Sequence, residues 1–311
     1  MALFYILVFP GFLFLSTLSF WVEYFDRKFC AKLQNRVGPP WFQPLADFVK
    51  LLAKEDIMPE EADTTVFHLI PTVALTATIT TIFYIPLWGT RALLPFPGDL
   101  IIVLYLLTVP TFCFFLGGWY SRSVYAMIGA GRALIQLFAY EVPLLMAILA
   151  AALLANSWSI SEISVFYATH PWLALCNIVG FGVALVALLG KLEKVPFDIP
   201  EAETEIVAGC FTEYGGRLLA LLNLTRNIEE IVGAALLAAV FLPFGLSLGP
   251  VPGFCFFILK VFLVVALISV LRTIMARLRI DQMIELCWKT FAPLAFFQVL
   301  LNLILKGVIR S

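Results

Sequence analysis

Two ionisable side chains stand inside long apolar stretches of this sequence. Glu141 lies in the run AYEVP, and Lys260 lies in a later apolar run. A carboxylate in hydrocarbon is costly and is therefore a candidate functional group, here one that could accept and release protons. The alternative is a carboxylate near the end of a span, solvated or paired with Arg132. Lys260 is the natural opposite charge for Glu141, although its long stem could also carry the amine toward an interface.

The segment 191–226 is the most unusual part of the chain. Six carboxylates lie within 21 residues: Glu193, Asp198, Glu201, Glu203, Glu205 and Glu213. After Pro200, the spacing of Glu201 and Glu205 predicts one shared helix face. Acids this close titrate as coupled sites, which can hold and pass protons or attract a cation. A solvated loop is the alternative, but the apolar residues between the acids favour a segment that folds against something.

The segment 272–287 is basic instead. It contains Arg272, Arg277 and Arg279, followed by Asp281. Ordinary membrane anchoring explains the arginines alone. The functional alternative is that they dock an acidic partner or gate the glutamates.

Signatures of covalent chemistry are missing from the sequence. It has no G-x-G-x-x-G, P-loop, H-E-x-x-H or G-x-S-x-G motif. Six cysteines form no C-x-x-C pair, and there are two histidines, so we expect neither a metal site nor an iron–sulfur cluster in this chain. We therefore expect no catalytic residue here. The formal net charge of -1 argues against nucleic acid as a partner.

Apolar spans must position these groups. The 311 residues are 62% hydrophobic and 13% charged, with a mean hydropathy of +0.98, which suits a bilayer rather than water. A span needs about 20 apolar residues. The sequence predicts an all-α integral membrane protein with about eight transmembrane helices, over 2–22, 67–88, 100–118, 133–155, 172–190, 227–244, 253–271 and 288–306.

The positive charges alternate between the connections. Sixteen of the 20 Lys and Arg residues lie on the odd-numbered connections, and Arg91 alone lies on an even one. The positive-inside rule then places the odd connections in the cytoplasm and both termini outside. This predicts a multi-pass protein of a cell membrane.

We expect a single membrane domain over 1–311 with three cytoplasmic connections. The first, 23–66, should contain an amphipathic helix that starts near Pro44. Leu45, Phe48 with Val49, and Leu52 would share its apolar face, and Asp47, Lys50 and Lys54 would lie outside that face. The second is the acidic segment 191–226, and the third is the basic segment 272–287. The first helix is too long for a cleaved signal and is expected to be retained.

Four blocks of sequence now resemble a known family. They are the run from Asn35 through Arg36, Gln43 and Asp47 to Lys50, the acids from Glu193 to Glu213, the run from Arg272 to Asp281, and Glu141 with its neighbours. Together they resemble subunit 1, the H-type membrane subunit, of respiratory complex I. The resemblance covers nearly the whole chain and is strongest for the members found in energy-converting membrane-bound [NiFe] hydrogenases and related redox complexes.

The resemblance implies a membrane anchor and coupling subunit. Soluble hydrogenase-like large and small subunits, with a Ni-Fe centre and iron–sulfur clusters, would dock on its cytoplasmic face, and antiporter-like subunits would lie beside it in a prokaryotic plasma membrane. The acids from Glu193 to Glu213, together with Glu141 and Lys260, would form the proton or ion path. Docking or gating would involve Arg36, Gln43, Asp47, Lys50, Arg272, Arg277, Arg279 and Asp281.

The stretch from Gly38 to Pro44 is shorter than in quinone-using members, which argues against quinone as a ligand. We therefore expect a non-catalytic subunit of an oxidoreductase complex that drives H+ or Na+ transfer. One alternative is a quinone-binding complex I subunit. Another is an autonomous secondary ion transporter, against which the lack of paired Gly/Pro-broken spans counts. The electron acceptor, whether protons, polysulfide or quinone, stays open.

Overall fold

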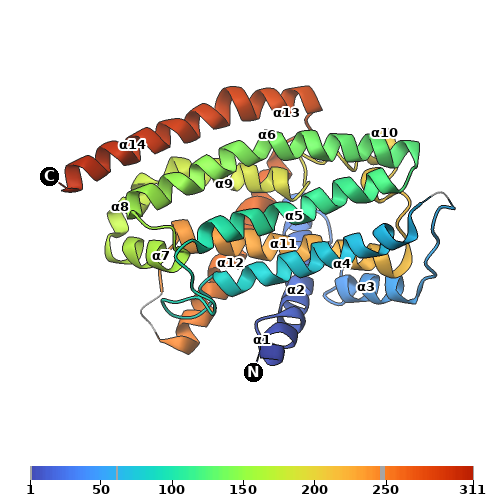
Figure 1. The fold of residues 1–311 in the computed structure, drawn as a ribbon, viewed down its shortest axis with the longest axis horizontal. Coiled ribbons are helices and arrows are strands. Elements are labelled where there is room, and N and C mark those ends of the chain that lie inside the picture. The colour runs from blue at the N-terminus through green and yellow to red at the C-terminus, as the bar shows by residue number, and fades with distance from the viewer. Residues whose placement is uncertain (1, 61, 246–248, 311) are drawn as a thin grey trace.

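The computed structural model describes residues 2–60, 62–245 and 249–310, and every regular element in these residues is a helix (Figure 1). This confirms the prediction of an all-α membrane fold. Six stretches are long and apolar enough to cross a bilayer: Leu3–Leu33, Thr64–Tyr84, Asp99–Tyr120, Val124–Ala155, Pro250–Ile274 and Ile280–Val308. The predicted total of eight spans stays a prediction.

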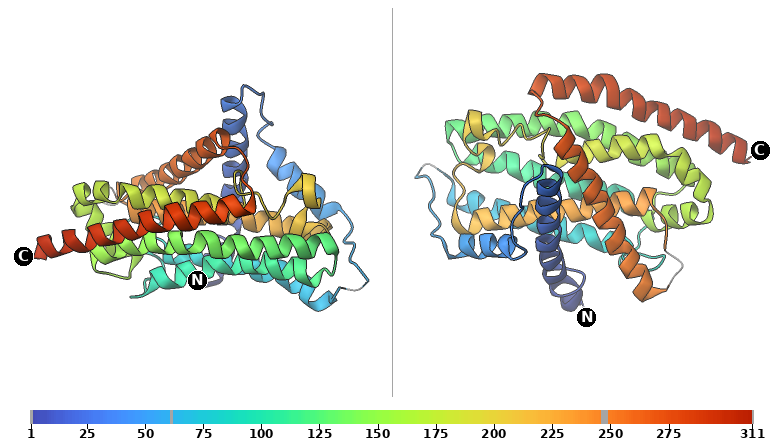
Figure 2. Two further views of the ribbon diagram at one scale, coloured as in Figure 1. Left: turned by 90° about the horizontal axis from the view of Figure 1, so that it is seen from above. Right: turned by 180° about the vertical axis from the view of Figure 1, so that it is seen from behind.

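Most of the long helices lie side by side along one axis. They are α4 (Thr64–Thr81), α5 (Asp99–Tyr120), α6 (Val124–Ala155), α9 (Ile178–Lys191), α11 (Gly216–Phe241) and α14 (Ala292–Arg310) (Figure 1). Two further helices, α2 (Phe12–Leu33) and α12 (Pro250–Ile274), cross this bundle obliquely (Figure 2). Short helices complete the chain: α1 (Ala2–Leu7), α7 (Ile160–Thr169), α8 (Pro171–Cys176), α10 (Glu203–Ile206) and α13 (Ile280–Leu286).

The two ends of the bundle differ. Helices α3 (Gln43–Ala53) and α10 lie at one end, which we call the charged end because the acidic connection 192–215 is there (Figure 1). Helices α7 and α8 and the C-terminus lie at the other end, which we call the opposite end.

Helix α11 is the centre of the bundle. It packs against α2, α3, α4, α7, α9 and α12. Every residue from Ile228 to Phe241 is buried. Because α11 also carries Arg226, Glu229 and Glu230, its composition is too charged for the apolar pattern of a span, and it begins at Gly216 rather than at the predicted 227. Arg226 therefore lies inside the helix and not before it.

Other helix boundaries differ from the predicted spans for local reasons. The first span is divided by Pro10 and Gly11, and α2 then continues to Leu33, beyond the predicted end at 22. Helix α6 starts at Val124, ahead of the predicted 133. The fifth span is interrupted at Asn177 between α8 and α9, and α7 precedes it. In the extension of α2, Asp26 is buried against its neighbours, which hydropathy alone does not reveal.

Helix α3 confirms the predicted amphipathic helix, although its inward face is different. Pro44, Asp47, Phe48 and Leu51 face the protein, so Phe48 of the predicted apolar face is turned inward while the rest of that face is exposed. That exposed face consists of Leu45, Val49 and Leu52. An apolar outer face suits a helix lying at a membrane surface. Asp47 lies outside this exposed apolar face, as predicted, and it lines the inner side of the helix.

The chain after α3 is tied to the start of α11. Asp56 accepts hydrogen bonds from the backbone N–H of Arg217 (2.7 Å) and from its Nε (2.8 Å). Gly216 has φ +53°, and a Cβ there would clash with Oδ1 of Asp56. Glycine is required at this position by both the backbone angle and the close approach. The tie fixes the first connection beside the N-terminus of the central helix.

Candidate functional site

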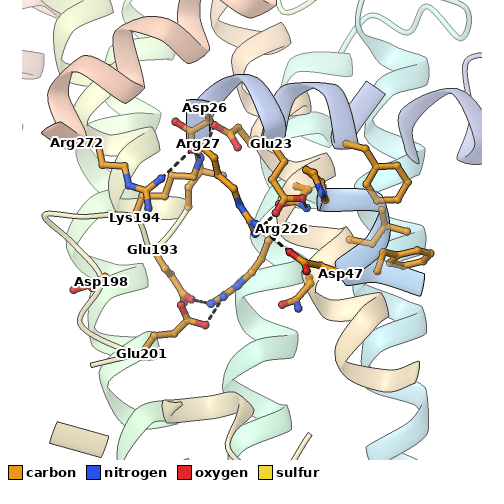
Figure 3. A pocket seen from close by; sticks show the side chains of 18 of the residues that line it. Glu23, Asp26, Arg27, Asp47, Glu193, Lys194, Asp198, Glu201, Arg226 and Arg272 are labelled. Carbon is orange, nitrogen blue, oxygen red and sulfur yellow. Dashed lines mark hydrogen bonds and ion pairs between the residues drawn. The ribbon is translucent and has the colours of Figure 1, made fainter. Parts of the chain in front are cut away.

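A cavity of about 410 Å³ lies at the charged end, between α2, α3, α11 and the connection after α9. We call it the acid–base cavity because charged side chains dominate its lining (Figure 3). They are Glu23, Asp26, Arg27, Asp47, Glu193, Lys194, Asp198, Glu201, Arg226, Glu230 and Arg272. Acids predicted from one connection thus meet bases from several helices.

Arg226 holds two of the predicted acids. Its Nη1 pairs with Glu201 and its Nη2 with Glu193, while the guanidinium lies 4.3 Å from the ring centre of Phe211. Burial raises the pKa of Glu193 to about 7, against the opposing charge of Arg226. Its Oε1 is buried and has no hydrogen-bond partner in the described part of the chain. Glu193 is therefore a carboxyl that can gain or lose a proton near neutral pH.

A second buried group surrounds Asp26. Its Oδ2 accepts from Lys194 Nζ (2.8 Å) and from Arg272 Nη1 (2.9 Å), and its Oδ1 accepts from Ser269 (2.5 Å). Lys194 also donates to Glu230 (2.6 Å). Burial alone would lower the pKa of Lys194, but the charges of Glu230 and Asp26 raise it. Two acids and two bases from α2, α11, α12 and the acidic connection thus share one network.

A third ion pair lies deeper along α11. Lys191, at the end of α9, pairs with Glu229 (Nζ to Oε1, 3.0 Å), and both side chains are 1% exposed. The same amine donates to the carbonyl oxygen of Leu107 and lies 5.8 Å from the ring centre of Tyr140. Glu141, half-buried, is the next residue after Tyr140. The charges therefore continue from the acid–base cavity toward Glu141.

A smaller cavity of about 290 Å³ opens beside the acidic connection, and we call it the arginine cavity. Its charged lining comprises Arg132, Glu205, Arg277, Arg279 and Asp281. Arg132 donates to Glu205 (2.6 Å), which holds the pKa of that exposed carboxyl below its usual range. Arg277 Nε pairs with Asp198 Oδ1 (2.7 Å). Arg277, which was predicted to take part in docking or gating, thus contacts the acidic connection directly.

Most predicted residues gather at the charged end. Arg36 and Lys50 are exposed on the first connection, Gln43 donates to Asp47 (2.8 Å), and Glu213 is half-buried. Glu203 belongs to α10, but its side chain lies outside the described residues. Lys260 lies apart from this group, on α12.

Two expectations are wrong. Glu201 lies before the short helix α10 and Glu205 lies inside it, so they share no helix face, and each pairs with a different arginine. Lys260 does not pair with Glu141: it is buried on α12 against α7 and α11, and the charge beside Tyr140 and Glu141 is Lys191. The spacing in the sequence predicted that Glu201 and Glu205 are neighbours of like charge. In the folded chain each of them instead pairs with an arginine from another helix.

Sequence reasoning missed several members of the three networks. It gives Asp26 no role, and it treats Lys191, Lys194 and Arg226 as ordinary positive charges of the connections. Glu229 and Glu230 extend the acidic line in the sequence, but no partner for them is evident there. One signal in the sequence could have indicated these partners. Arg226 precedes Glu229 by three residues and Glu230 by four, and this spacing places all three on adjacent turns of one helix.

Among the described residues, no group of three or more His, Cys, Asp or Glu side chains could hold a metal ion. The site is therefore an arrangement of carboxylates, amines and guanidinium groups. Such groups can take up, hold and pass protons, and they respond to a nearby change of charge.

Comparisons with known proteins agree with each other. A family model described as NADH dehydrogenase matches residues 4–303. The chain is 34% identical to the H-type subunit of NADH-quinone oxidoreductase from Carboxydothermus hydrogenoformans, over 94% of this chain and 85% of the relative. It is 36% identical to the corresponding subunit from Dehalococcoides mccartyi, over 96% and 85%.

A solved structure is similar as well. It belongs to a membrane-bound sulfane sulfur reductase, an archaeal respiratory membrane complex, and superposes with a TM-score of 0.82 at 27% identity. The match covers 93% of this chain and 96% of the other. The arrangement of helices described above is therefore that of a subunit in a respiratory membrane complex.

Proposed function

The chain belongs to the complex I subunit 1 family and is a multi-pass membrane subunit of a respiratory redox complex, and from this premise we propose that it couples redox chemistry to ion transfer. It would anchor a soluble arm whose large and small subunits resemble those of a hydrogenase and carry the Ni-Fe centre and iron–sulfur clusters. Antiporter-like membrane subunits would carry H+ or Na+. Redox chemistry would take place in the arm and not in this chain.

The observation that carries the proposal is the line of charges along α11, of which Glu229 and Glu230 are buried and Arg226 is half-buried. Arg226, Glu229 and Glu230 occupy adjacent turns, and each pairs with a residue from another segment. Buried charge pairs are weak sources of stability, because desolvation offsets much of their attraction. Three of them on one helix are therefore better explained by a function than by stability.

The line has a starting point and a direction. Glu193, whose pKa burial raises to about 7, lies at the wall of the acid–base cavity and can change protonation near neutral pH. A change of charge in a docked arm would alter its proton occupancy and the balance of Arg226 between Glu193 and Glu201. Glu229 and Lys191 would pass that change toward Glu141, and Glu141 toward the neighbouring ion-carrying subunits.

Docking is assigned to the charged end. The arginine cavity presents Arg277 and Arg279 beside the acidic connection, and Arg36 and Lys50 are exposed on the first connection. A partner bound there would contact the groups that hold Asp198 and Glu205. With this end in the cytoplasm of a prokaryote, both termini would lie outside, as the positive-inside rule predicts.

The experiment is a pair of neutral substitutions in the intact complex. Glu141→Gln and Glu229→Gln remove one protonatable group each and keep similar shape. We expect redox turnover to continue while ion uptake into vesicles per electron transferred is lost. Glu285→Gln is the matched control, because Glu285 is exposed and pairs with Lys289 outside the line. Unchanged ion uptake in both substituted complexes would contradict the relay.

A quinone-binding function is the second candidate. The relatives named above are NADH-quinone oxidoreductase subunits, and the acid–base cavity has space for a small molecule. Its lining is mostly charged, however, whereas ligand pockets for apolar molecules are predominantly hydrophobic. Quinone that copurifies with the complex, or inhibition by quinone-site blockers, would favour this candidate. Nickel in the purified complex without quinone would favour the hydrogenase-like arm.

A further inference from the structure

Lys260 occupies a separate buried site in the half of the molecule toward the opposite end. Its side chain is 9% exposed and lines a cavity of about 10 Å³, at the lower limit of the space that admits one water. Ser164, Ala239, Pro243 and Phe257 are among the other lining residues. No hydrogen bond or ion pair of its amine is found with residues 2–60, 62–245 or 249–310.

The surroundings of Lys260 offer polar atoms but no charge. Pro243 lacks an N–H, so the carbonyl oxygen of Ala239 has no helical donor from that position. It accepts instead from the hydroxyl of Ser164 (2.7 Å), and a carbonyl oxygen has a second lone pair to offer. The residues that reach this cavity from α7, α11 and the connection after α4 carry no titratable group.

The charged groups of the neighbouring elements point elsewhere. On α11, Glu230 precedes Ala239 by nine residues, which is roughly 13 Å along the helix axis. Glu23 and Asp26 of α2 and Lys191 of α9 belong to the networks of the charged end. Glu162 of α7 and Arg91 line a different cavity.

That other cavity leads to the opposite end of the bundle. It measures about 660 Å³ and is lined by Thr90, Arg91, Ser159, Ser161 and Glu162. Ser161 and Ser164 are three residues apart on α7 and so lie on the same side of that helix. One serine borders the open cavity and the other borders the cavity of Lys260. Polar side chains of α7 therefore lie between the cavity of Lys260 and the cavity at the opposite end.

We propose that Lys260 is a proton-binding site of its own, which exchanges protons with the opposite end through Ser164 and the cavity lined by Ser161. An unpaired ammonium in an apolar site is costly, whereas the neutral amine is far less so. A lysine held this way binds and releases a proton as conditions change at the end it communicates with. The site would be independent of the line from Glu193 to Glu141, and the proposal does not rest on coupling.

The test uses the intact complex in sealed vesicles whose inner and outer pH are set separately. Brief treatment with acetic anhydride acetylates neutral amines, and mass spectrometry of the peptide that contains Lys260 gives the rate. We expect the rate to depend on the pH at the end remote from the redox arm, rising about tenfold per pH unit while the amine is mostly protonated. Lys289, which is exposed, serves as the reference amine.

Two substitutions check the route. Ser164→Val and the milder Ser164→Ala should slow the response of Lys260 to that pH, while Ser16→Val, at a partly exposed serine on α2, should leave it unchanged. A rate that follows the pH on the arm side would overturn the proposal, as would a Lys260 that stays unlabelled at high pH on both sides. Redox turnover and ion uptake are not read out, so failure here is distinct from failure of the coupling function.

Discussion

Two neighbouring stretches of α11 lie in the same interior but are built from different residues. The charged stretch, Arg226 to Glu230, pairs Arg226, Glu229 and Glu230 with other segments. The apolar stretch, Ile231 to Phe241, carries no charge and is fully buried. The same helix thus carries ion pairs along one stretch and only uncharged residues along the next. Since buried ion pairs are weak sources of stability, the comparison teaches that the charges of the first stretch are better explained by function than by stability.

The largest effect is expected from Arg226→Met. Removing one partner of a buried ion pair leaves the other charge uncompensated and typically costs about 3–5 kcal/mol. Here both Glu193 and Glu201 lose their partner, so the purified complex should unfold at lower temperature and assemble in lower yield. Thermal unfolding of the complex in detergent measures the loss. An unchanged unfolding temperature would show that the two acids are protonated and need no partner.

Leu237→Ala examines the apolar stretch of the same helix. Leu237 is 1% exposed, and its truncation leaves a cavity that costs about 2–5 kcal/mol in soluble cores. The loss should fall at the lower end, because lipid tails are as apolar as leucine. Ion uptake per electron transferred should stay normal in the complexes that assemble. Loss of coupling in this variant would erase the distinction between the two stretches.

Glu193→Gln sharpens the comparison through pH. Burial raises the pKa of Glu193 to about 7, so the folded protein keeps this proton above the ordinary value near 4.5. The folded state then binds more protons than the unfolded state between those values, and stability falls as pH rises through that range. The substitution should flatten this dependence. Infrared difference spectra should also lose a carboxylic acid band that titrates near pH 7 in the parent.

Gly233→Ala is expected to have the smallest effect. A Cβ at this position would lie 2.5 Å from Cδ1 of Leu188, the far end of a flexible side chain that can move. The alanine gains about 1 kcal/mol of helix propensity, which offsets the displacement. Unfolding temperature and coupling should both stay close to those of the parent. A large fall in the unfolding temperature would show that Leu188 cannot move aside and that α9 and α11 need glycine at position 233.

The general fold was open to prediction because a bilayer imposes length and hydropathy on each span. The amphipathic helix α3 followed from the spacing around Pro44, and the acids of the connection 192–215 followed from their density. Which side of each helix faces the protein was harder to predict. Asp47 points inward because α3 packs on α2 and α11, and hydropathy does not record which neighbour a helix has.

The acids of the connection 192–215 were predictable, but their pairing partners and Asp26 were not. Asp26, Lys194 and Arg272 meet in space but are far apart in sequence, so no local spacing connects them. Lys191 and Lys194 count as positive charges of a connection, and both are also ion-pair partners inside the protein, Lys191 buried and Lys194 half-buried. A rule that counts charges treats both roles alike. Separating them requires the tertiary contacts of α9 with α11.

Asp26 has a mechanical consequence for the subunit. Its single oxygen Oδ2 accepts from both Lys194 and Arg272, while Oδ1 accepts from Ser269. If the acidic connection, α2 or the end of α12 moved relative to the other two, Asp26 would lose a hydrogen bond from Lys194 or Arg272. At this point the three segments have few independent degrees of freedom. A displacement of one segment would therefore have to be followed by the other two if the hydrogen bonds of Asp26 are to be kept.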